Sequence, residues 1–166
     1  MRWIWIDTFV EFVAGERASA IKNVTLAEEH LRDHFPGYPV MPPSLVIEGM
    51  AQTAGILVGE ARSFRENVIL AKIRLAEFTD YAVPGDQLRY DAVIESLDEQ
   101  AAVTSGTVSK NGTVIGHVDL IFSHVNQATK ELDLPDHNFV FTDQFTSLLA
   151  TFRDQAIARS EPSDGS

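Results

Sequence analysis

The chain has 166 residues, 45% of them hydrophobic and 22% charged, and these proportions suit one globular domain rather than a disordered chain. Its 24 acidic and 13 basic residues give a formal net charge of −11, which argues against nonspecific binding to nucleic acid or to an anionic membrane. The absence of cysteine excludes disulfides, thiolate metal ligands and cysteine nucleophiles.

The first elements in chain order form a predicted hairpin. Residues 3–13 are rich in aromatic and β-branched residues and predict a strand, and residues 17–24 predict a second strand after a short turn. Residues 25–33 predict a short helical turn, with Thr25 as its N-cap and Glu28 completing a capping box. Four prolines and one glycine follow within residues 34–43, so we expect a constrained loop there.

The most apolar segment of the chain runs from Ser44 to about Arg62. It is apolar on almost all sides and prolines precede it, so it predicts a buried helix that Ser44 can cap. Four strand-like runs follow, over residues 68–78, 87–97, 101–110 and 113–124. Asn111-Gly112 between the last two is typical of a tight hairpin turn. The order predicts an α+β fold in which one antiparallel sheet wraps around one long helix.

The composition changes near Asn126. Residues 126–138 are polar, residues 142–158 carry apolar side chains at helical spacing, and the chain ends in a polar tail. We therefore expect one domain over residues 1–125. Residues 126–166 are expected to form a polar linker, a short amphipathic helix and a disordered tail.

Two ionisable residues stand out as candidates for chemistry. His34 opens the proline-rich loop, and Glu48 lies in the most apolar helix, where a charged carboxylate is costly unless it is paired. Burial favours the neutral acid, so we expect Glu48 to donate a proton and a neutral His34 to accept one. Gln52 lies one turn after Glu48 on the same helix face and can hydrogen-bond and orient the carboxyl group.

A longer pattern surrounds these residues. It consists of HFPGYPVMP at residues 34–42 and LVIEGMAQTAG at residues 45–55, with further matches at Ile6-Asp7, Lys22-Asn23-Val24, Phe78 and residues 83–88. This pattern resembles the 3-hydroxyacyl-acyl-carrier-protein dehydratases of FabZ type, which have the hotdog fold and act in fatty-acid synthesis. The resemblance covers roughly residues 4–124.

The resemblance implies roles for the residues of the pattern. His34 would be the catalytic base and Glu48 the catalytic acid in the conversion of a (3R)-hydroxyacyl thioester to the trans-2-enoyl thioester. Gly37, Pro43, Ser44 and Gln52 would be substrate-binding residues. Family members share each site between two subunits, so we expect at least a homodimer, assembled further as a trimer of dimers. No cofactor is expected.

The chain departs from the family at two points. The family has a glycine at the position of Pro43, and the backbone N–H of that glycine binds the thioester carbonyl, whereas proline has no N–H. Ser44 can substitute through its own N–H or hydroxyl. Family members also carry basic residues just after the position of Phe78, where this chain has Thr79 and Asp80. Because an acyl carrier protein is acidic, it would need a basic patch to dock, and this patch could consist of Arg62, Arg65, Lys72 and Arg74. Coenzyme A thioesters are the alternative substrates.

Other functions stay open at this point. A hotdog thioesterase would use the carboxylate to activate water, and a non-catalytic acyl-thioester-binding module would be consistent with Pro43. His30 and His34 have the i, i+4 spacing of metal ligands on a helix, but Pro36 and Gly37 end any helix there and no third ligand is apparent, so no metal is expected. No signal peptide and no run of about 20 apolar residues is recognisable, so we expect a cytoplasmic protein that does not bind membranes.

Overall fold

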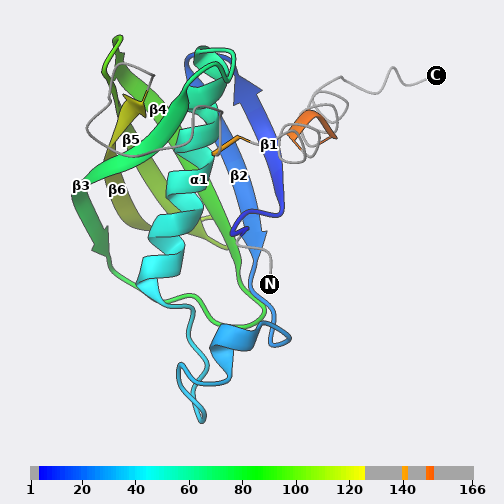
Figure 1. Ribbon diagram of the computed structural model, residues 1–166. Coiled ribbons are helices and arrows are strands. Elements are labelled where there is room, and N and C mark those ends of the chain that lie inside the picture. The colour runs from blue at the N-terminus through cyan, green and yellow to red at the C-terminus, as the bar shows by residue number, and fades with distance from the viewer. Residues whose placement is uncertain (1–3, 126–139, 142–148, 152–166) are drawn as a thin grey trace.

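A curved antiparallel sheet of six strands wraps around one long helix (Figure 1). The computed structural model describes residues 4–125, 140–141 and 149–151. Its elements are β1 (Thr8–Val13), β2 (Arg17–Asn23), the 3₁₀ helix η1 (Glu29–Leu31), α1 (Pro43–Ala61), β3 (Asn67–Phe78), β4 (Gln87–Leu97), β5 (Ala101–Lys110) and β6 (Thr113–Val125). The strand order is β1-β2-β4-β5-β6-β3, which puts β1 and β3 at the two edges. The predicted α+β architecture is confirmed.

Helix α1 forms the centre of the core because it is apolar on almost every side. From Gly49 to Gly59, every residue except Gln52 is buried. The sheet approaches α1 closely at Gly49, where an added Cβ would lie 2.5 Å from the ring and hydroxyl of Tyr90 on β4. Only a residue without a side chain allows this distance. Burial raises the pKa of Tyr90, so its phenol stays neutral under the helix.

The four strands after α1 lie where the sequence predicts them. Asn111 and Gly112 join β5 to β6 with φ angles of 50° and 86°, the left-handed conformation that a two-residue hairpin turn requires. Residues 149–151 are helical, within the helix predicted for residues 142–158. The rest of that predicted helix and the predicted tail lie outside the described residues, and the domain division at residue 125 stays a prediction. No helix within the described residues is both long enough and apolar enough to cross a membrane.

Three local predictions before α1 are corrected by the structure. The first strand begins at Thr8, because the Trp5 N–H bonds to the side chain of Gln52 rather than to a neighbouring strand. The capping box fails because the Glu28 carboxylate is paired with Lys22, although Thr25 Oγ1 still accepts a hydrogen bond from the N–H two residues later.

The cap of the long helix is also corrected. Helix α1 begins at Pro43 with Pro42 as its N-cap, so Ser44 is the second helical residue and not the cap. The fixed φ of proline suits the first helical position, where its missing N–H costs no intrahelical bond.

His124 makes the stability of this fold sensitive to acid. Its side chain is fully buried on β6, with Nδ1 3.4 Å from Glu66 Oε2. Burial lowers the pKa of His124, Arg62 lowers it further, and Glu66 and Asp98 oppose the shift. The unfolded chain therefore takes up this proton at a higher pH than the folded chain does, so the contribution to stability is complete above the ordinary value of 6.5 and is lost as the pH falls below it.

We predict that His124→Leu flattens the decline of the melting temperature as the pH falls below 6.5. Thermal unfolding of the wild type and the variant over a pH series measures this. His117→Leu is the matched control, because His117 lies exposed on the same strand. Equal pH slopes for the wild type and the His124 variant would contradict the assignment.

Candidate active site

Two successive hydrogen bonds connect Glu48 on α1 to the backbone of the N-terminal segment. The Trp5 N–H donates to Gln52 Oε1 at 2.8 Å, and Gln52 Nε2 donates to Glu48 Oε1 at 3.0 Å. Because the amide oxygen already accepts from the backbone, the amide nitrogen is directed at the carboxylate. The hydrogen bond expected from the spacing of Glu48 and Gln52 is therefore present.

Glu48 and Gln52 open into a cavity of about 340 Å³, which we term the Glu48 cavity. Its lining residues are Ile4, Glu48, Ala51, Gln52, Gly55, Ile56, Val68, Leu70, Phe122, Val140 and Phe141. Apart from Glu48 and Gln52, these residues are glycine, alanine and larger apolar residues. A proton-transferring group at one end of an apolar cavity is the arrangement expected of a site for a ligand with an acyl chain.

His34 lies in the loop before α1, and its imidazole is oriented by the same loop. Its Nδ1 is 2.8 Å from the Val40 carbonyl oxygen, and its own carbonyl accepts from the Val40 N–H at 2.8 Å. A carbonyl oxygen only accepts, so Nδ1 carries a proton, and Nε2 is the ring nitrogen left to act as a base. The ring is half-buried and stacks on Phe35 with a centroid distance of 4.2 Å.

The structure brings Glu48 and Gln52 together on the wall of one cavity. His34 is not among the described residues that line the Glu48 cavity. Burial lowers the pKa of His30, four residues before His34, and the Glu28 carboxylate opposes this shift. The described residues contain no group of three histidine, aspartate or glutamate side chains that could hold a metal ion.

The remaining site candidates lie around the start of α1. Ser44 is exposed, and the two N–H groups that follow it, of Leu45 and Val46, both donate to the Pro42 carbonyl. The Ser44 N–H makes no such bond within the described part of the chain, so it is the first donor that the helix offers to a ligand. Gly37 lies in an exposed turn where nothing is within 4 Å of an added Cβ, so one chain gives no steric reason for a glycine there.

Two contributions to the site lie beyond what the sequence pattern indicates. The backbone N–H of Trp5 orients Gln52, which lies 47 positions later in the sequence. Val140 and Phe141, which come from the C-terminal part of the chain, line the cavity. A backbone donor has no sequence signal of its own. Phe141 could be noticed only as an apolar residue between a polar stretch and an amphipathic one.

Comparison with known proteins shows the family. The FabA-like domain model matches residues 4–119. The 3-hydroxyacyl-[acyl-carrier-protein] dehydratase FabZ of Granulibacter bethesdensis is 40% identical over 118 residues, which cover 68% of this chain and 68% of the relative. The chain belongs to the FabZ-type dehydratases. The protein of the same name from Bacillus pumilus is 35% identical over 122 residues, which cover 73% of this chain and 85% of the relative.

Solved structures of low sequence identity share the hotdog fold. The dehydratase heterocomplex ApeI:P from Xenorhabdus doucetiae matches with a TM-score of 0.64 at 17% identity, covering 80% of this chain and 91% of that one. A protein from Streptococcus mutans, smu.793 bound to acetyl CoA, matches with a TM-score of 0.60 at 12% identity, covering 75% of this chain and 93% of that one. These likenesses support the fold rather than the chemistry.

We predict that Gln52→Leu lowers kcat by up to about tenfold, since a hydrogen bond between neutral groups is worth about 0.5–1.5 kcal/mol. If Gln52 acts through its hydrogen bond to Glu48, KM should change little, whereas a direct contact between Gln52 and the substrate would also raise KM. Steady-state kinetics with a hydroxyacyl thioester measures both constants, and melting temperature reports the loss of the Trp5 N–H acceptor. An unchanged kcat in the folded variant would contradict a positioning role.

Proposed function

We propose that the chain dehydrates (3R)-3-hydroxyacyl thioesters to trans-2-enoyl thioesters, with His34 as the base and Glu48 as the acid. The proposal rests mainly on one observation: Glu48 accepts a hydrogen bond from Gln52 and lines a cavity whose other walls are almost all apolar. The relatives named 3-hydroxyacyl-[acyl-carrier-protein] dehydratase support the same reaction.

The proton transfers balance with these two residues alone. Nε2 of His34 takes a proton from C2 of the substrate, and the electron pair of that C–H bond forms the C2–C3 double bond. The bond between C3 and the hydroxyl breaks, and protonated Glu48 donates its proton to the departing oxygen, which leaves as water. A proton passing from His34 back to Glu48 restores both groups.

The charge that develops on the thioester oxygen needs a donor. Pro43 supplies none, because it has no N–H and occupies the first position of α1. We assign the role to the Ser44 N–H, which lies next along the helix start and has the helix dipole behind it.

Two observations support a dimer with shared sites. His34 is not among the described residues that line the Glu48 cavity. In addition, β3 is an edge strand whose residues 71–77 are all exposed, with Ile73 at 45% and Leu75 at 39%. An exposed apolar edge strand is a template for pairing with another chain. We propose that a second copy pairs at this edge and that its His34 loop completes the site at the Glu48 cavity.

The carrier and the larger assembly belong to the same proposal. Acyl carrier protein is the proposed carrier, as in the names of the relatives. Lys72, Arg74 and Arg65 are exposed and offer basic contacts, whereas Arg62 pairs with Glu66 at 3.3 Å and Asp80 pairs with Lys110. The trimer of dimers, the cytoplasmic location and the substrate-binding role of Gly37 stay predictions.

We predict that His34→Ala and Glu48→Gln each lower kcat by about 10²–10⁴-fold, which is the usual worth of a general acid or base. The hydration of crotonyl thioesters, followed by ultraviolet absorbance with acyl-carrier-protein and coenzyme A forms, measures this. Glu60→Gln on the same helix and His117→Ala are matched controls that should keep wild-type rates. A thioester that is hydrolysed instead of hydrated would identify a thioesterase, and a wild type that binds without turnover would identify a binding module.

We predict that Pro43→Gly and Pro43→Ala both raise kcat, by about tenfold at most, because each adds a donor beside the Ser44 N–H. Pro43→Gly should also lower the melting temperature, since glycine frees the unfolded chain. Comparing the two variants separates the donor from the flexibility. If neither folded variant gains in kcat, Ser44 or another donor already stabilises the oxyanion fully.

A further inference from the structure

The Glu48 cavity is lined by residues of α1 from Glu48 to Ile56, and its polar side chains, Glu48 and Gln52, belong to the N-terminal half of this span. Its helix residues fall on successive turns, at Glu48, then at Ala51 and Gln52, then at Gly55 and Ile56. The axial distance from Glu48 to Ile56 is about 12 Å at 1.5 Å per residue. An acyl chain whose reacting carbons lie at Glu48 would therefore run toward the C-terminal end of α1 along apolar walls.

Phe141 lines this cavity and lies against the C-terminal part of α1. Its side chain is buried, and a Cβ added to Gly59 would lie 2.7 Å from its ring atoms, so the ring rests directly on the helix one turn beyond Gly55. The ring of Phe64 packs edge-on against it with a centroid distance of 5.0 Å. The preceding residue is fixed as well, because the Val140 N–H donates to Asn67 Oδ1 at 3.2 Å.

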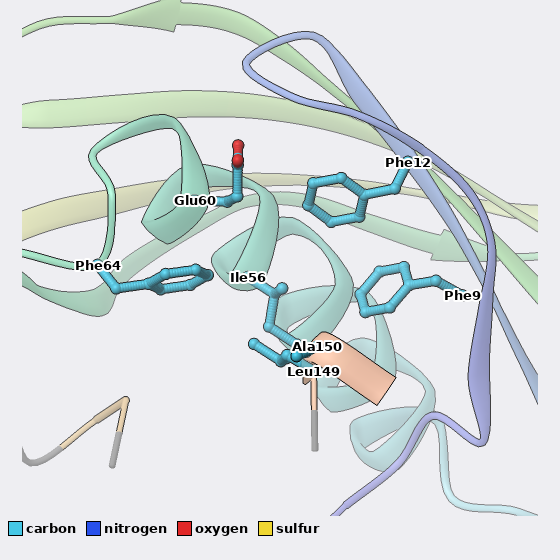
Figure 2. A pocket seen from close by; sticks show the side chains of 7 residues that line it. All are labelled: Phe9, Phe12, Ile56, Glu60, Phe64, Leu149 and Ala150. Carbon is cyan, nitrogen blue, oxygen red and sulfur yellow. The ribbon is translucent and has the colours of Figure 1, made fainter. Parts of the chain in front are cut away.

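A second, mostly apolar cavity of about 190 Å³ adjoins Ile56 and Phe64 (Figure 2). It is lined by Phe9, Phe12, Ile56, Glu60, Phe64, Leu149 and Ala150. Ile56 lines both cavities, and Phe64 joins them through its contact with Phe141. In Figure 2 the rings of Phe9 and Phe12 lie on one side of Ile56 and the ring of Phe64 lies on the other. Ile56 thus borders both cavities, and the contact between Phe64 and Phe141 joins a wall of one to a wall of the other.

We propose that Phe141 is the residue that limits the length of the acyl chain, restricting the Glu48 cavity to short and medium chains. This inference rests on the dehydration proposed above. Phe141 lies outside residues 4–119, the span that matches the FabA-like domain, so the limit is a property of this chain's C-terminal part. The cavity of about 340 Å³ is small for a ligand site, and a longer chain would have to displace a ring that is packed on both Gly59 and Phe64.

The test compares kcat/KM for 3-hydroxybutanoyl, 3-hydroxyoctanoyl, 3-hydroxydodecanoyl and 3-hydroxyhexadecanoyl thioesters on one carrier. We expect the wild type to decline steeply beyond octanoyl. Phe141→Ala should raise the dodecanoyl-to-butanoyl ratio by about tenfold or more, the discrimination typical of a changed hydrophobic pocket. Phe12→Ala is the matched control, because it removes a ring from the second cavity alone and should leave the ratio unchanged.

The possible failures are distinguishable. Inactivity of the folded wild type on every substrate, butanoyl included, would overturn the dehydration itself. A wild type that shows no decline with length, or a Phe141→Ala variant that is active with an unchanged ratio, would overturn the role of Phe141 alone. If Phe141→Ala does not fold, Phe141→Leu and Ile56→Ala open the same path with smaller changes, and an unchanged ratio in both overturns the proposal equally.

Discussion

The structure depends on the need to cover a helix that is apolar on almost all of its sides. The curved sheet covers most of α1, and Val140 and Phe141 cover part of its C-terminal end. Gln52 is the one residue between Gly49 and Gly59 that is not buried, and it lies with Glu48 where the cover is incomplete. The Glu48 cavity is this gap, so the position of the site follows from the way the core is closed.

The two proposed catalytic side chains are oriented by the same physical means, which is a hydrogen bond that leads to the backbone. Gln52 links Glu48 to the Trp5 N–H, and the Val40 carbonyl fixes the proton of His34 on Nδ1. Backbone groups hold such positions at a low entropy cost, because the fold has already ordered them. Each side chain is thereby prepared for its proton transfer before substrate binds.

Much of this molecule could be predicted from its sequence, because local patterns determine the elements. Strand-like runs and the Asn111-Gly112 turn place the last four strands, and the unbroken apolar run places α1. The prediction was wrong where a distant partner competes with a local one. The Glu28 carboxylate forms an ion pair with Lys22 instead of completing a capping box. The Trp5 N–H donates to the Gln52 side chain instead of pairing with a neighbouring strand.

The candidate site also has features that local spacing predicts and features that it does not. The i, i+4 spacing of Glu48 and Gln52 predicts their hydrogen bond, since both lie on one face of one helix. No spacing predicts that Phe141 rests on Gly59, because contacts across 82 positions depend on how the whole chain folds back. Local spacing likewise does not determine where His34 lies relative to the Glu48 cavity.

The central claim is that one chain supplies Glu48 and its partner supplies His34, and a mixture of two inactive variants tests it most directly. His34→Ala and Glu48→Gln subunits are combined under conditions where subunit exchange is demonstrated, and the rate of crotonyl thioester hydration is measured. The account predicts recovery to about a quarter of the wild-type rate, because half of the dimers are mixed and one of their two sites is intact. No recovery after full exchange would contradict the claim. Either both residues of each site would then come from one chain, or the two residues would not act in the same reaction.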